Sequence, residues 1–263
     1  MNVRHVRAVL RREALELRRN RLVALTMAIL PTALVASAVA TTAFIARTPE
    51  GEFRGDVPAG LAPQLRALGH GRDALLGLVA DQYLYMLLLI ALALPSTIAA
   101  HAIVGEKVER TLEPLLATPI ATSDLLLGKC LAAVVPATLI TQLGYVLTVA
   151  GFAWTCPASV VALTCRPVWP LAFGLVVPAL AMLSALASIV ASSRVNDPRT
   201  AQGLVGFLVI PVIGAGISSV MGRLFLDVGH LAWGALGVLV LDTAVLWLAV
   251  KLFSREAILT RWK

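Results

Sequence analysis

Long apolar runs alternate with short polar connections along almost the whole chain. Six of these runs are long enough to cross a bilayer, which takes about 20 residues in a helix. Their expected bounds are Leu22–Ala46, Tyr83–Val104, Leu125–Trp154, Val168–Ala191, Ala201–Met221 and Leu231–Val250. The pattern predicts an all-α polytopic membrane protein with six transmembrane helices over residues 22–263 and no separate soluble domain.

Residues 1–21, before the first run, predict an amphipathic elbow helix on the cytoplasmic face. One helical stripe is apolar, and another carries arginines: Val3, Val6, Leu10, Ala14 and Leu17 on the first, and Arg4, Arg7, Arg11 and Arg18 on the second. Such a helix lies in the membrane interface, with its arginines on lipid phosphates. A generic basic topology anchor is the alternative. The apolar run that follows exceeds the core of a signal peptide, so we expect it to be retained.

Composition agrees with a chain whose main solvent is lipid. The sequence is 59% hydrophobic and only 14% charged, whereas soluble domains carry about 25% charged residues. Its mean hydropathy is +0.86. The net charge of +7 does not indicate a nucleic-acid partner, because the basic residues flank apolar spans instead of covering a soluble face.

The basic residues also set the expected orientation. Of the 22 Lys and Arg residues, the first, third and fifth loops hold only Arg47, Arg54, Arg66, Arg72, Arg166 and Arg223. The positive-inside rule therefore places both termini in the cytoplasm of a cell that carries the chain in its plasma or inner membrane. The largest loop, residues 47–81, then lies outside. Its leucines have near-helical spacing, so a short surface helix and an irregular loop both remain open: Leu61, Leu65, Leu68, Leu75, Leu76 and then Val79.

The second cytoplasmic connection, "GEKVERTLEPLLATP" from Gly105 to Pro119, is unusually charged. Apolar positions with helical spacing lie between its charges: Val108, Leu112, Leu115 and Leu116. Pro114 is expected to break or restart the helix. The pattern predicts a short amphipathic helix, held near the bilayer, that suits docking in a groove of a soluble partner.

At these residues the sequence resembles a family, the type-2 ABC-transporter permeases. The likeness runs from Gly105 to Lys129 and includes Gly105, Gly128 and Lys129. It implies a coupling helix that contacts an ATPase through Glu106, Glu109, Arg110, Thr111, Leu112, Glu113, Leu115, Leu116, Thr118 and Pro119. "SSRVNDPRTAQ", from Ser192 to Gln202, resembles the family's connection between spans four and five, which implies a second cytoplasmic contact at Arg194, Asp197 and Arg199.

The resemblance implies the permease subunit of an exporter, forming half of a translocation pathway. The sequence has no G-x-x-x-x-G-K-[ST] phosphate loop, so we expect ATP and Mg to bind a separate ATPase subunit and this chain to bind no cofactor. The chain itself is then not an enzyme. The family pairs two permease units, which implies a homodimer or a paired heterodimer.

Polar residues inside the spans are candidates for the pathway, because charges at the bilayer centre cost about 2.5–3.5 kcal/mol on insertion scales. Asp242 could line the pathway, pair with a polar or basic neighbour, or bind a cation. Gln142 could line the pathway or join helices, and His101 could reach headgroups. Prolines also interrupt the spans and predict local bends: Pro95, Pro136, Pro178 and Pro211.

Cys156 and Cys165 share the third connection, which is expected to lie outside, where disulfides persist. We therefore predict a disulfide between them. The sequence has no CxxC and no His/Cys cluster, so no zinc site is expected.

Two other classes of membrane protein have different sequence requirements. A stand-alone secondary transporter or channel would favour an internal repeat and several midplane charges, and a polytopic enzyme would need a catalytic cluster. The four histidines are scattered, and Asp242 is the one acid deep in a span. Both alternatives are less consistent with the residues than a permease.

Overall fold

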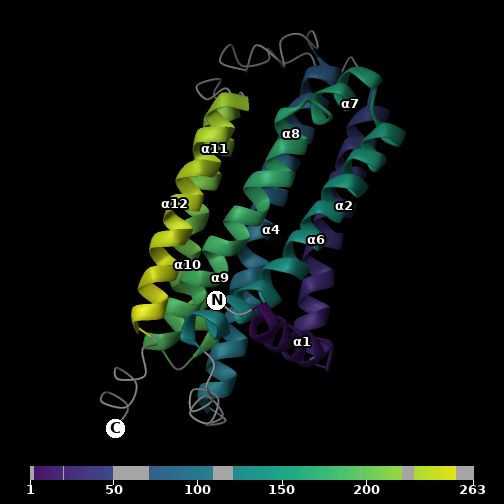
Figure 1. Cartoon of the computed structure of the whole chain (residues 1–263). Coiled ribbons are helices and arrows are strands. Elements are labelled where there is room, and N and C mark those ends of the chain that lie inside the picture. Colours follow the sequence, from purple (N-terminus) through teal and green to yellow (C-terminus); the bar gives the residue numbers. More distant parts are fainter. Residues whose placement is uncertain are drawn as a thin grey trace.

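The computed structural model describes residues 3–19, 21–49, 71–108, 121–195, 197–220 and 228–252, and all regular structure within them is helical. Six helical stretches in this part of the chain are long and apolar enough to span a membrane (Figure 1), which confirms the six predicted spans. The elements are α1 (Val3–Arg19), α2 (Arg21–Arg47), α4 (Arg72–Val108), α6 (Thr122–Thr155), α7 (Ala158–Thr164), α8 (Val168–Leu171), η2 (Ala172–Val176), α9 (Val177–Arg194), α10 (Pro198–Val205), η3 (Gly206–Leu208), α11 (Val209–Val220) and α12 (Val228–Leu252).

The long helices run up and down, and α1 lies across one end of the bundle (Figure 1). At this end α4, α9 and α12 finish, and α2, α6 and α10 begin. We call it the α1 end. The two connections that the charge pattern assigns to the cytoplasm, after α4 and after α9, both leave from it. The shared position agrees with the topology predicted from the sequence.

Helix α4 lies at the centre of the bundle, because it packs against α2, α6, α9, α10 and α11. Its apolar residues are buried on several faces, including Leu84, Leu87, Leu92 and Ile103. A helix that is apolar all round is suited to such a position. Large apolar side chains are instead exposed on the outer faces of the surrounding helices, for instance Ile29, Leu139, Ile210 and Trp247. Those faces suit a lipid environment.

A row of serines on α9 joins it to α4. Ser184 Oγ donates to the Leu92 carbonyl, and Ser188 Oγ donates to the Ser96 carbonyl at 2.9 Å. Both serines are fully buried, so their hydroxyls need such partners. Their small size also allows close approach of the two helices.

Two of the predicted proline interruptions coincide with departures from α-helix. The π-helical turn η2 ends at Val176, two residues before Pro178, whose missing N–H leaves the Gly174 carbonyl without its usual donor. The 3₁₀ turn η3 ends at Leu208, three residues before Pro211. Helices α4 and α6 continue through Pro95 and Pro136.

The second half of the predicted outer loop is not a separate surface helix. Leu75, Leu76 and Val79 belong to the first turns of α4, where Leu76 is buried in a cluster with Ile45 and Phe152. Asp73 favours a helix start there, because an acid in the first turn interacts well with the helix dipole. Leu61, Leu65 and Leu68 lie outside the described residues.

The contact between α2 and α6 depends on a glycine. A Cβ atom added at Gly151 would lie 2.2 Å from Val39 Cγ2. We therefore predict that Gly151→Ala lowers the free energy of unfolding by about 1–3 kcal/mol, as overpacking does. Thermal unfolding of the purified chain in detergent measures the change. Gly214→Ala is the matched control, because no atom lies within 4 Å of its added Cβ. Equal losses in the two variants would contradict the prediction.

Candidate functional site

The predicted coupling segment falls mostly outside the described residues. Glu106 lies in the last turn of α4. The other predicted contacts lie in residues 109–120, of whose structure nothing is described: Glu109, Arg110, Thr111, Leu112, Glu113, Leu115, Leu116, Thr118 and Pro119. What the structure does describe is the two helices that hold the segment, α4 before it and α6 after it.

The first turns of α6 are fastened to α1 by a buried ion pair. Lys129 Nζ donates to Glu13 Oε1 at 2.6 Å, and the two residues are only 3% and 5% exposed. A charge-assisted hydrogen bond this short is among the stronger ones in proteins. Burial also makes each charge dependent on the other, since removing one partner leaves an uncompensated buried charge.

Two further contacts lie beside this pair. A Cβ atom added at Gly128 would be 2.8 Å from Val9 Cβ, so the glycine allows α1 to approach α6 closely. His5 Nδ1 lies 4.0 Å from Asp124 Oδ2, in the first turn of α6. We call Val9, Glu13, Gly128 and Lys129 the α1–α6 clamp.

The clamp corrects part of the sequence interpretation of the N-terminal helix. Residues 3–19 do form a helix, but the face packed on α6 carries Val9 and Glu13. Of the predicted apolar stripe, Val6 and Leu10 are half-buried and Ala14 is exposed. Helix α1 thus has a third face, turned toward the protein. A signal for it existed in the sequence, since Glu13 is an acid four residues after Val9 in a helix rich in arginine.

The connection between α9 and α10 also lies at the α1 end. Asp197 caps α10: its Oδ2 accepts from the Thr200 amide at 3.0 Å and from the Thr200 hydroxyl at 2.9 Å. Those hydrogen bonds, the side-chain one first, hold the pKa of Asp197 below its ordinary value. Arg199 is exposed, and Arg194 is the last residue of α9. The predicted second contact is therefore a well-formed helix start with an exposed arginine.

The polar residues inside the spans differ in their surroundings. Gln142 Nε2 donates to the Phe173 carbonyl at 3.4 Å, so it joins α6 to η2. His101 is exposed near the end of α4. Asp242 is buried on α12, and neither carboxylate oxygen has a hydrogen-bond partner among the described residues. The pairing considered for Asp242 from the sequence is thus not found in that part of the chain.

The predicted disulfide between Cys156 and Cys165 is not formed, because both are free thiols. Helix α7 lies between them, and its seven residues extend about 10 Å at 1.5 Å per residue. Cysteines joined by a disulfide have Cα atoms at most about 7 Å apart. The sequence pattern does not predict this helix.

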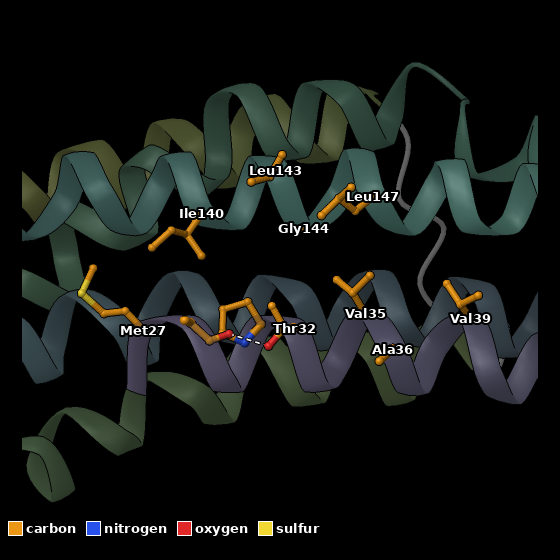
Figure 2. A pocket seen from close by; sticks show the side chains of 11 residues that line it. Met27, Thr32, Val35, Ala36, Val39, Ile140, Leu143, Gly144 and Leu147 are labelled. Carbon is orange, nitrogen blue, oxygen red and sulfur yellow. Dashed lines mark hydrogen bonds between the residues drawn. The ribbon is translucent and has the colours of Figure 1, made fainter. Parts of the chain in front are cut away.

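An apolar groove of about 670 Å³ runs between α2 and α6 (Figure 2). Thr32 is the polar side chain in its lining, and its hydroxyl donates to the Ala28 carbonyl of its own helix at 2.6 Å. The lining therefore suits hydrocarbon better than an ion. It consists of Met27, Ala28, Pro31, Thr32, Val35, Ala36, Val39, Ile140, Leu143, Gly144 and Leu147.

We predict that reversing either charge of the clamp loosens α1. Glu13→Lys or Lys129→Glu should each cost about 3–5 kcal/mol, because each replaces the buried ion pair by two like charges in contact. Amide exchange over residues 3–19 would rise, and the double swap Glu13→Lys with Lys129→Glu should restore part of the protection. Arg11→Gln is the control, because Arg11 is exposed on the same helix. Unchanged exchange in both single variants would contradict the prediction.

We also predict that Asp197→Ala frays the start of α10, whereas Asp197→Asn or Asp197→Ser preserves it. Amide exchange at Thr200 measures the difference. Because the pKa of Asp197 is lowered in the folded chain, its stabilising effect is present above the ordinary pKa of an unfolded aspartate. The effect disappears as the pH falls through the lower folded value. Exchange at Thr200 that is the same in all variants would count against the cap.

The comparisons with known proteins agree with this architecture. The model of the family described as ABC-2 family transporter protein matches residues 7–230, from α1 to the start of α12. No curated protein matches the chain. The family match covers well over half of the sequence, including the clamp, the segment after α4 and the cap of α10. The chain therefore belongs to the ABC-2 family of transporter proteins, the membrane-spanning permeases of ABC transporters.

Proposed function

We propose that the chain is the permease subunit of an ABC exporter, driven by a separate ATPase subunit that docks on Gly105–Pro119. The observation that carries this proposal is the place of that segment in the fold. It leaves the end of α4, the central helix of the bundle, and enters α6 at the turns held by the clamp. A partner that moves the segment therefore acts on the core of the bundle and on α1 together.

The sequence of the segment supports a protein partner over plain solvent. Its apolar positions, Val108, Leu112, Leu115 and Leu116, have helical spacing, and charges lie between them. The absence of a phosphate-loop pattern from the sequence agrees with ATP and Mg binding to the partner. The exposed Arg199, beside the capped start of α10, is a second contact candidate at the same end of the bundle.

The proposal includes a second permease subunit, either an identical copy or a related chain, because six spans make half of a pathway in this family. It places the α1 end, and with it both chain termini, in the cytoplasm. The excess of Lys and Arg in the connections at that end supports this orientation. The arginine face of α1, with Arg7 and Arg11 exposed, would then meet the phosphates of the inner leaflet.

We predict that Glu113→Ala and Leu116→Ala reduce co-purification of the ATPase subunit with the tagged chain. The first removes a charge and the second an apolar anchor from the proposed docking surface. The loss should be at least about tenfold for Leu116, which corresponds to about 1.4 kcal/mol.

Glu52→Ala is the matched control, because Glu52 lies in the loop predicted to be outside. Each variant is first checked for normal membrane insertion. Undiminished binding of the ATPase to both the Glu113→Ala and the Leu116→Ala variants would contradict the docking proposal.

A further inference from the structure

Asp242 is a buried acid that takes part neither in the clamp nor in the hydrogen bonds between helices described above. It lies on the face of α12 that packs on its neighbours, a face that also carries Leu231, Ala235 and Ala249. The residue is 7% exposed, and both carboxylate oxygens are buried without a hydrogen-bond partner in the described part of the chain. At 1.5 Å per residue it is about 15 Å from the end of α12, well inside the span.

The main described neighbours of α12 are α6, α8, η2 and α9, and none of them brings a cation to this carboxyl. Helices α8 and η2 carry no titratable residue, and α9 carries only Arg194, at its far end. Helix α6 contributes the buried thiol of Cys130, which lies near enough to Asp242 to interact with it electrostatically. Its Lys129 is bound to Glu13.

The remaining titratable groups are placed elsewhere. On α6, Asp124 lies in the first turn beside His5, and Tyr145 donates to the Thr164 carbonyl. On α12 itself, His230 and Lys251 lie near its two ends, and Lys251 is over the Trp247 ring. Apart from the Cys130 thiol, these helices therefore bring no titratable group to Asp242.

A carboxylate in such a place is costly, since an isolated charge moved from water into an apolar medium loses many kcal/mol of solvation and neutralises instead. A metal ion would need several ligands, and no group of three or more His, Cys, Asp or Glu residues occurs in the described ranges. A proton needs only one carboxyl. We propose that Asp242 is a proton-binding site inside the spanning bundle, whose carboxyl keeps its proton at neutral pH while α12 is packed on α6 and α9.

Such a site links the shape of the bundle to pH. Any conformation that brings water to Asp242 lets the carboxyl ionise, so alkaline pH favours that conformation over the packed one. The inference concerns the spanning helices alone and is independent of the proposed docking of an ATPase.

Infrared spectra of the purified full chain in phosphatidylcholine vesicles, with ¹³C-labelled aspartate carboxyls, test the proposal directly. At neutral pH the wild type should show the C=O stretch of one protonated aspartic acid. The band should be lost in Asp242→Asn and kept in Asp124→Asn. Asp124 is the matched control, because it is also buried but lies beside His5.

Three results would overturn the proposal: no protonated band in the wild type, loss of the band in Asp124→Asn instead, or its loss when sodium or potassium chloride is added. The last would mean that a cation occupies the site in place of the proton.

A second measurement uses the wild type alone and so does not depend on the folding of a variant. Dicyclohexylcarbodiimide adds to a protonated carboxyl: the acid O–H adds across a C=N bond, the proton passes to nitrogen, and nothing leaves. Mass spectrometry should locate the adduct at Asp242, with a yield that falls from neutral to strongly alkaline pH as the carboxyl ionises. A yield that does not fall, or an adduct absent from Asp242, would overturn the proposal.

Discussion

The buried ion pair between Glu13 and Lys129 is the interaction on which the α1 end of the bundle depends. Water cannot replace either partner, because both side chains are almost fully enclosed. The pair and the close Val9–Gly128 contact make α1 and the first turns of α6 one mechanical unit. The chain enters that unit directly from the charged segment after α4. A displacement of the segment is therefore shared between a spanning helix and a helix that lies across the end of the bundle.

Most buried polar groups within the spans are bonded either to their own helix, as Thr138 and Thr141 are, or to a neighbouring helix. Ser184 and Ser188 bond to α4, and Gln142 bonds to η2, so their hydrogen-bonding capacity is used inside the protein. Asp242 differs because its oxygens have no such partner among the described residues. Evolution tolerates a lone acid in a lipid-solvated bundle at a cost in stability. The Ser192 hydroxyl also lacks a hydrogen-bond partner among the described residues, but it is neutral, whereas Asp242 is an acid, and that difference singles Asp242 out.

The spans could be predicted from sequence because a run of about 20 apolar residues has few other uses. The clamp could not, since Glu13 and Lys129 are 116 positions apart and periodicity only reports faces of a single helix. For the same reason periodicity predicts the stripe through Val6 and Leu10 but not the face turned toward α6. Helix α7 lies between Cys156 and Cys165, which are both free thiols in the structure, and spacing along the chain does not reveal such a helix.

The serines of α9 have a geometric consequence for sliding between helices. Ser184, Ser188 and Ser192 recur every four residues, as do their acceptors on α4, the carbonyls of Leu92 and Ser96. The Ser192 hydroxyl has no hydrogen-bond partner in the described residues. A slide of one residue, about 1.5 Å, breaks both bonds, whereas a slide of four residues, about 6 Å, brings Ser188 and Ser192 to the same two carbonyls. The contact thus favours helix registers that differ by four residues over the positions between them.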